Sequence, residues 1–246
     1  MSEWISEQKS IKNKSDEKHE EECAIIVKGI LQGLYYTHDE YELIHRDIKP
    51  DNILFKHKGD LNSIKICDFG LASAVGIGFF DQNDDNAGTL IYQAPEQIQS
   101  TSYGKKIDIW ATGMITYEII TKGGHPVLGI DFYNDLKMSL DDYRNKMMNI
   151  SNNESIVKSC EHISPLAIKL LENMLNVSPN HRYIAHRALK HPWITRDETA
   201  NIPLNMFEEI QMNMKAYEKL KIAQKIAFAM SMINETMIKK HPERFR

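Results

Sequence analysis

Hydrophobic residues near the start of the chain recur at helical spacing. Ile26, Ile30 and Leu34 stand four residues apart within residues 20–38, and this spacing predicts a helix with one buried face. The preceding residues, 1–19, are rich in polar and charged side chains. We expect them to form a frayed or loop-rich lead-in ahead of that helix.

Two short apolar runs come next and predict strands. They read "NILF" at 52–55 and "SIKIC" at 63–67, and they flank the polar segment "KHKGDLN". Gly59 and Asp60 in that segment mark a tight turn. We therefore expect two short strands joined by a turn, followed by an irregular stretch over residues 68–94.

A longer apolar run, "DIWATGMITYEIIT" at 108–121, is hydrophobic on nearly every face. Such a run predicts a buried central helix, which Gly123, Gly124 and Pro126 would end. The segment that follows, 131–150, is polar and amphipathic and is expected to be an excursion from the core.

The last part of the apolar pattern contains clear start and stop signals. Ser164 and Pro165 precede "LAIKLLENMLN" and predict a helix with Ser164 as N-cap and Pro165 at the first helical position. Residues 185–194, "AHRALKHPWI", predict a short helix that Pro192 stops. Helices therefore dominate, and the fold class is mainly α with a few short strands.

Residues 203–238 continue the helical pattern. Apolar side chains from Phe207 to Met237 follow one another at steps of three or four, which predicts one face of a long amphipathic helix. Several lysines stand beside that face: Lys215, Lys219, Lys221 and Lys225.

Composition narrows the function class. The 246 residues are 42% hydrophobic and 26% charged, which is ordinary globular usage and suits one sizeable domain with an appendage, or two modest ones. A net charge of −4 offers no electrostatic reason to expect nucleic acid as a partner. No apolar run is long enough to span a bilayer, and the polar N-terminus is no secretory signal. The three cysteines are too scattered for a disulfide framework or a zinc site, so we expect a reduced, cytoplasmic protein that binds no membrane.

Chemistry-bearing residues gather in "HRDIKPDNIL" at 45–54. An acid, Asp47, is followed by Lys49 and Asn52, and a second acid, Asp68, ends the second predicted strand. Phosphoryl transfer needs a carboxylate to orient a hydroxyl, oxygen ligands for Mg²⁺ and a cation near the transferred group. The alternative for the loop alone is a solvated turn ahead of a buried strand.

Further motifs decide against that alternative. "HRDIKPDN", "DFG", "GTLIYQAPE", "DIWATG" and "NHRYIAHRALKHPWI" follow one another in this order, and together they resemble the eukaryotic serine/threonine protein kinases. The resemblance covers residues 20–194 and implies the family's larger, C-terminal lobe, which is mainly α with short strands at the catalytic loop. It divides the chain into a lead-in (1–19), this lobe (20–194), a linker (195–202) and a helical tail (203–246).

The resemblance implies a role for each residue of the catalytic loop. Asp47 is expected to be the catalytic base, and Lys49 to lie near the γ-phosphate of ATP. Asn52 and Asp68 are expected to bind Mg²⁺, and Asp68 also to lie at the nucleotide. Leu54 resembles the family's apolar floor under adenine.

A second set of residues has structural or regulatory roles by the same resemblance. His45 and Phe69 are expected to stack in a hydrophobic column, and Gly70 to free the backbone after Asp68. Asp108 is expected to anchor the backbone of the catalytic loop. The remaining expected pair is Glu96 with Arg182, which would brace the lobe.

Arg46 raises the question of how the activation segment is held. Kinases with an Arg before the catalytic Asp often pair it with a phosphate, yet the stretch from Ala74 to Gly88 contains no Ser, Thr or Tyr. It does contain carboxylates, which can pair with a guanidinium in a similar geometry: Asp81, Asp84 and Asp85. Thr89 resembles the threonine that contacts the catalytic loop.

The smaller, sheet-rich lobe of the family has no counterpart in the sequence. The 46 residues before Asp47 contain no "GxGxxG" and no "VAIK"-like strand. Two interpretations stay open: a fragment of a longer active kinase that uses ATP and Mg²⁺ on protein substrates, or an inactive kinase-like scaffold or calmodulin-binding module.

The tail has its own resemblance. "NMKAYEKLKIAQKIAFAMS" is similar to the junction segment that follows the kinase domain in calcium-dependent protein kinases. This implies calmodulin or a calmodulin-like domain as a partner through residues 205–238. The alternative is a helix packed on its own lobe.

Overall fold

Two long helices form the centre of the fold. The structure, a computed structural model, describes residues 1–10, 16–74, 90–99, 102–126, 139–148 and 163–196. The chain divides into two units, Met1–Ala200 and Asn201–Arg246, and all of these residues lie in the first.

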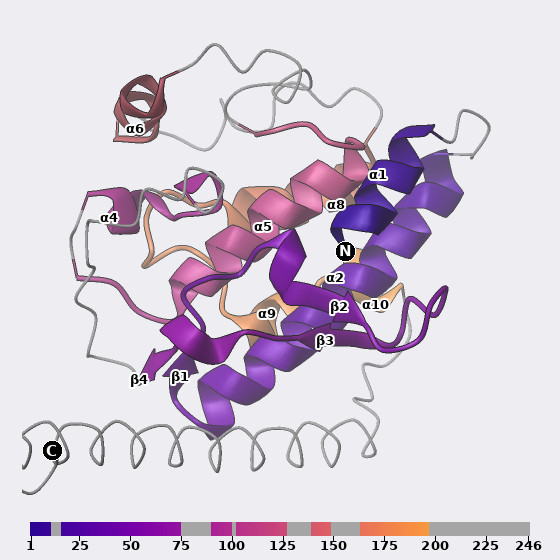
Figure 1. Ribbon diagram of the computed structural model, residues 1–246, viewed down its shortest axis with the longest axis horizontal. Helices are drawn as coiled ribbons and strands as arrows, with labels where there is room; N and C mark the ends of the chain where they lie inside the picture. Colours follow the sequence, from indigo (N-terminus) through magenta and orange to yellow (C-terminus); the bar gives the residue numbers. More distant parts are fainter. Residues whose placement is uncertain (11–15, 75–89, 100–101, 127–138, 149–162, 197–246) are drawn as a thin grey trace, which may run out of the picture. The chain divides into compact units, whose positions relative to one another are not determined.

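Helix α2 (Asp16–Glu40) packs against helix α5 (Lys106–Ile120), and α8 (Pro165–Met174) covers α5 from another side (Figure 1). Every residue of α5 from Ile107 to Ile120 is buried, as expected for a helix that is apolar on nearly every face. Both long helices were predicted. α2 begins four residues before and ends two residues after the predicted 20–38, whereas α5 begins two residues before and ends one residue before the limits of the predicted 108–121. The mainly α fold class is confirmed.

The expectation for the first residues is wrong. Residues Ser2–Ser10 form helix α1, and α2 begins at Asp16. Met1 and Ile5 are buried in the core, and Trp4 stacks on His19 of α2 with 6.0 Å between ring centroids. The spacing of Met1 and Ile5 carried this signal, but the many polar and charged residues in the rest of the segment 1–19 hid it.

The strands form two small antiparallel pairs. β2 (Ile53–Phe55) pairs with β3 (Ile64–Ile66), and Gly59 in the turn between them has a φ of 82°, a left-handed conformation that glycine adopts readily. This pair was predicted. β1 (Leu43–Ile44) pairs with β4 (Ser73–Ala74), which two-residue runs cannot signal. Short 3₁₀ turns, Pro50–Asn52 and Phe69–Leu71, adjoin the strands.

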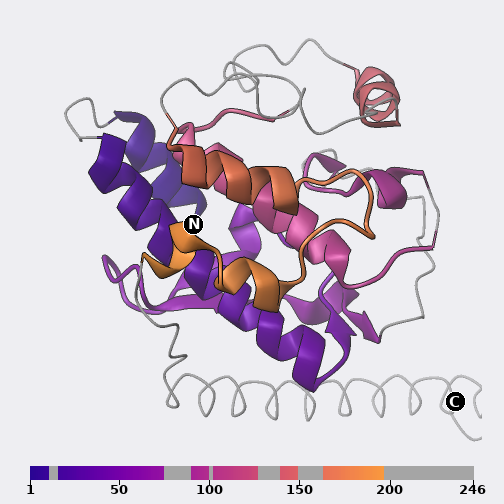
Figure 2. The same ribbon diagram turned by 180° about the vertical axis from the view of Figure 1, so that it is seen from behind.

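Helices α9 (Ala185–Leu189) and α10 (Pro192–Thr195) lie along α2, as the view from behind shows (Figure 2). Pro192 was expected to stop a single helix, and this is wrong in one respect, because Pro192 also begins α10. Proline suits the first position of a helix, where its missing N–H is not needed. The side chain of His191 caps α10 by accepting a hydrogen bond from the Trp193 N–H.

The predicted start of α8 is confirmed. The Ser164 side chain accepts a hydrogen bond from the backbone N–H of Ala167, and Pro165 is the first helical residue. No element was predicted for α4 (Pro95–Ile98), and α6 (Leu140–Met148) lies within the segment 131–150 that was expected to be an amphipathic excursion. Among the described residues, no helix is long and apolar enough to cross a lipid bilayer.

A buried carboxylate joins three of these helices. Glu20 of α2, 9% exposed, accepts hydrogen bonds from Ser164 N at 2.6 Å, Ser164 Oγ at 2.7 Å and Trp193 Nε1 at 3.0 Å. Replacing Glu20 by Gln leaves at least one of these donors without an acceptor. We expect Glu20→Gln to lower the free energy of unfolding by about 1–3 kcal/mol in urea denaturation.

Glu21 provides the matched control for this prediction. Among the described residues its exposed carboxylate pairs with the exposed side chain of Arg196, at 2.8 Å, and surface pairs of this kind contribute about 0–1 kcal/mol. Glu21→Gln should therefore change stability less than Glu20→Gln. Equal losses in the two variants would contradict a specific role for the buried carboxylate.

Candidate active site

The loop between β1 and β2 brings three predicted residues together. Asp47 is 6% exposed, and its Oδ2 lies 2.8 Å from Lys49 Nζ and 2.9 Å from Asn52 Nδ2. The same Asn52 Nδ2 donates to the backbone carbonyl of Asp47 at 2.8 Å. The other carboxylate oxygen, Asp47 Oδ1, has no hydrogen-bond partner among the described residues. The loop therefore holds one oxygen of Asp47 and leaves the second as a potential acceptor.

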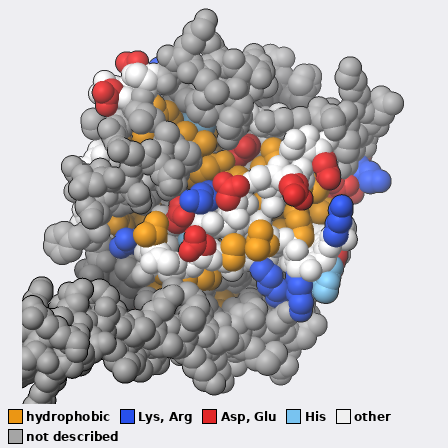
Figure 3. Space-filling view, in the orientation of Figure 1, with side chains coloured by type: hydrophobic (Ala, Val, Ile, Leu, Met, Phe, Trp, Pro, Cys, Tyr) orange, Lys and Arg blue, Asp and Glu red, His pale blue; other side chains and the backbone are white. Residues whose placement is uncertain are grey.

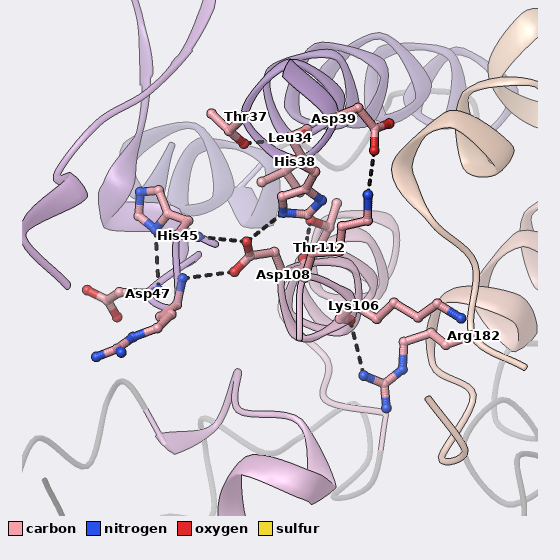
Figure 4. Close-up of polar contacts among 12 residues, drawn as sticks. Leu34, Thr37, His38, Asp39, His45, Asp47, Lys106, Asp108, Thr112 and Arg182 are labelled. Atoms are coloured by element: carbon pink, nitrogen blue, oxygen red, sulfur yellow. Dashed lines mark hydrogen bonds and ion pairs between the residues drawn. The ribbon is translucent and has the colours of Figure 1, made fainter. Parts of the chain in front are cut away.

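Asp108 of α5 binds the backbone of this loop through its carboxylate. Its carboxylate accepts hydrogen bonds from His45 N at 2.8 Å and Arg46 N at 2.9 Å (Figure 4). Arg46 has a φ of 71°, which costs a non-glycine residue energy that surrounding contacts must offset. This contact is the one that the resemblance implies for Asp108.

His38, at the end of α2, contacts the same carboxylate through Nε2 at 2.8 Å. Burial by itself would raise the pKa of Asp108, but the bond to His38 and the nearby His45 outweigh it, so that the pKa lies below its ordinary value. Asp108 therefore stays ionised and can accept all three hydrogen bonds. His38 was not predicted, and no motif in the sequence pointed to it.

The strand pair β2–β3 places Asp68 near this loop. Cys67 N donates to Asn52 O at 2.9 Å, and Asp68 follows with an exposed side chain and a φ of 61°. Asp68 Oδ1 accepts a hydrogen bond from Gly70 N at 3.2 Å. A Cβ at Gly70 would lie 3.0 Å from that oxygen, so a larger residue would crowd the carboxylate.

The expected contact between His45 and Phe69 is present, and the expected adenine-floor residue Leu54 is accessible. The rings of His45 and Phe69 meet edge to face with 4.6 Å between centroids, and His45 Nε2 lies 3.0 Å from Cys67 O. Leu54 on β2 is 48% exposed, an accessible position for an apolar ligand surface. On this face of the molecule, acidic and basic side chains lie next to one another among hydrophobic ones (Figure 3).

The arrangement fits a magnesium ion that comes with phosphate oxygens. Within the described ranges, no group of three or more His, Cys, Asp or Glu residues forms a metal cage. Mg²⁺ does not need one, because it is usually held by one or two carboxylates together with phosphates and water. The Asn52 amide nitrogen is used by Asp47, so its oxygen and the Asp68 carboxylate are the atoms that would hold the ion.

Glu96 and Arg182 form the brace that was expected of them. Arg182 donates from its two terminal nitrogens to the two oxygens of Glu96, at 2.6 and 2.9 Å, and its side chain is fully buried. The guanidinium also lies over the ring of Trp110, 4.9 Å from its centroid. The pair therefore links α4 to the segment that follows α8.

Several predictions fall outside the described residues. Thr89 and the acidic residues of the activation segment lie within 75–89, and the whole tail lies within 197–246. Their assigned roles stay predictions.

His125, which follows α5, predicts a measurable dependence of stability on pH. It is 3% exposed, and burial lowers its pKa from 6.5 to about 4, against the opposing effect of a hydrogen bond with the backbone of Ile91. Below pH 6.5 the unfolded chain binds a proton that the folded protein excludes, so the contribution is complete above pH 6.5 and is lost as the pH falls towards 4. The expected loss is about 3 kcal/mol in the free energy of unfolding.

Urea denaturation at a series of pH values between 6.5 and 4 measures this loss. His125→Gln carries no titrating ring, so its stability should fall by less across the same range. Parallel curves for the two proteins would contradict the assignment to His125, because the remaining acidic groups are common to both.

Comparisons with known proteins identify relatives of this chain. The chain is 31% identical over 197 residues to the calcium/calmodulin-dependent protein kinase cmkB of Emericella nidulans, covering 80% of this chain and 46% of the relative. It is 34% identical over 187 residues to the calcium/calmodulin-dependent protein kinase type II alpha chain of Drosophila melanogaster, and the match covers 73% of this chain and 32% of the relative. The chain thus spans less than half the length of these relatives.

A solved structure is similar in fold as well. The Rad53 kinase domain with SCD2, in complex with AMPPNP, matches with a TM-score of 0.54 and 32% identity, covering 76% of this chain and 62% of that one. Residues 2–194 match the family described as the protein kinase domain. Given this match over most of its length, together with the geometry of the catalytic loop, the chain belongs to the protein kinase family.

Proposed function

We propose that this chain transfers the γ-phosphate of ATP to serine or threonine hydroxyls of protein substrates, with Mg²⁺ as the metal ion. The observation that carries the proposal is the state of the Asp47 carboxylate. One oxygen is held by Lys49 and Asn52, and the other is left without a partner among the described residues. A general base needs this arrangement, because its orientation must be fixed while one oxygen accepts a hydroxyl proton.

The neighbouring residues have complementary roles in this proposal. Asp47 Oδ1 would accept a hydrogen bond from the substrate hydroxyl and orient it for attack. The Lys49 ammonium, 2.8 Å from Asp47 Oδ2, would balance negative charge on the transferred group. Asn52 and Asp68 would hold Mg²⁺, which neutralises phosphate charge when it is bound.

A direct assay tests the proposal. The purified chain is incubated with radiolabelled Mg–ATP and a mixture of serine- and threonine-containing peptides, and labelled phosphoserine and phosphothreonine are measured. We expect transfer that EDTA abolishes. Binding of a protein partner without any transfer would favour the alternative, a kinase-like scaffold.

We also propose that the tail binds calcium-loaded calmodulin or a calmodulin-like domain through residues 205–238. The support is the predicted amphipathic helix with its adjacent lysines and the description of two relatives as calcium/calmodulin-dependent kinases. The division into a lobe (20–194), a linker (195–202) and a tail (203–246) belongs to the same proposal.

The tail proposal predicts calcium-dependent binding of the full chain to calmodulin, measured by titration calorimetry and abolished by a chelator. Phe207→Ala and Met230→Ala should each weaken it about tenfold or more, because buried anchors carry most of such binding energy. Glu208→Gln, on the opposite side of the expected helix from Ile210 and Tyr217, is the control. If the chain does not bind calmodulin in calcium, the tail has another role.

A further inference from the structure

The segment Leu90–Gln93 lies against the catalytic loop. Tyr92 and Gln93 line a small hollow of about 10 Å³ together with Asp47 and Arg46. The Tyr92 hydroxyl donates to Glu118 Oε2 of α5 at 2.8 Å, so this part of the segment is tied to the core. If Asp47 binds a substrate hydroxyl as proposed, that hydroxyl would lie next to this segment.

Two buried side chains from other parts of the chain hold the preceding residue, Ile91. The Tyr143 hydroxyl of α6 donates to Ile91 O at 3.1 Å. His125 forms a hydrogen bond with the backbone of the same residue. The two rings also meet edge to face, with 5.7 Å between centroids.

Packing alone does not require these polar atoms. Tyr143 is 4% and His125 3% exposed, and phenylalanine would fill much of the same volume with no polar group to satisfy. Tyr143 and Met147 are the buried residues of the described side chains on α6, whereas Asp141, Asp142, Asn145 and Lys146 are exposed. The buried face of α6 thus directs its one hydroxyl at the backbone beside the catalytic loop.

We propose that Tyr143 and His125 are positioning residues for the protein substrate. They fix the backbone of residues 91–93 beside Asp47, in the place where the substrate residues next to the acceptor hydroxyl bind. This inference rests on the proposed function, and it assigns to Tyr143 of α6 and to His125 a part in substrate affinity and none in nucleotide binding.

Steady-state kinetics of the full chain test this role, with peptide and Mg–ATP varied separately. Tyr143→Phe removes one hydroxyl and should raise the KM for peptide about fivefold, while kcat and the KM for Mg–ATP stay unchanged. His125→Gln should act in the same direction. Because both side chains hold one backbone residue, the double variant should raise the KM for peptide by less than the product of the two single effects.

The matched control is Tyr36→Phe, which removes a hydroxyl from another buried tyrosine, one that contacts Tyr41 at 3.0 Å. Amide hydrogen exchange of the same proteins gives a second readout that does not need activity. Amides of residues 91–94 should exchange about fivefold faster in Tyr143→Phe than in the wild type, and at the wild-type rate in Tyr36→Phe.

The outcomes separate the two proposals. If the wild type transfers phosphate but the KM for peptide is unchanged in Tyr143→Phe and His125→Gln, the positioning role is overturned. If the wild type transfers no phosphate, the proposed function fails and the exchange data decide the present inference: unchanged exchange at residues 91–94 in Tyr143→Phe overturns it too.

Discussion

Asp47→Asn is expected to lower kcat for phosphoryl transfer by about 10²–10⁴-fold. Asparagine has nearly the same shape and can still offer one oxygen to Lys49 and Asn52, which lie 2.8 and 2.9 Å from Asp47 Oδ2. The atom that replaces Oδ1 is then an amide nitrogen, which can neither accept nor orient the substrate hydroxyl through a lone pair. The loss should therefore appear in kcat, with little change in the folding of the chain.

Initial-rate measurements under saturating peptide and Mg–ATP give this number, and circular dichroism checks the fold. Asp60→Asn makes the same chemical change at an exposed turn residue that accepts a hydrogen bond from Asn62 N, and it should keep the wild-type rate. If Asp47→Asn retained most of the wild-type kcat, Asp47 would not be the base and the proposed function would need another acceptor.

Arg182→Met is expected to lower the free energy of unfolding by about 3–5 kcal/mol, because it leaves the Glu96 carboxylate buried without its partner. The two residues now share two hydrogen bonds, at 2.6 and 2.9 Å. Arg182 also donates to the backbone carbonyls of Asn176 at 2.9 Å and Lys106 at 3.1 Å, and both lose a donor in the variant.

A double variant separates the uncompensated charge from the other contacts. Arg182→Met combined with Glu96→Leu removes both charges, so it should lose less stability than Arg182→Met alone. Arg196→Met is the exposed control, since the Arg196 side chain forms a surface pair with Glu21 at 2.8 Å, and it should cost less than about 1 kcal/mol. Urea denaturation measures all four proteins. A double variant less stable than the single one would show that the ion pair is not the main contribution of Arg182.

The sequence predicted those features of the fold that depend on neighbouring residues. The helical spacing around Ile26 and Ile30, the apolar run of α5 and the Ser164–Pro165 start of α8 correspond to helices in the structure. Each is a local pattern, in which side chains three or four residues apart share one face or one cap satisfies the first turn. In α1, charged residues masked the helical spacing of the apolar side chains, so that helix was not predicted.

Part of the candidate site was also predictable from neighbouring residues, and part only from the resemblance. Asp47, Lys49 and Asn52 lie within six residues, so their meeting was predictable from one loop, and the resemblance of the ordered motifs supplied the roles of Asp68, Asp108 and the Glu96–Arg182 pair.

Only the tertiary structure placed His38 on the Asp108 carboxylate, paired β1 with β4 and brought Tyr143 and His125 to Ile91. These contacts join residues far apart in sequence through single side chains or two-residue strands, which leave no periodic signal. They form because packing of α2, α5 and α6 buries polar groups that must then find hydrogen-bond partners.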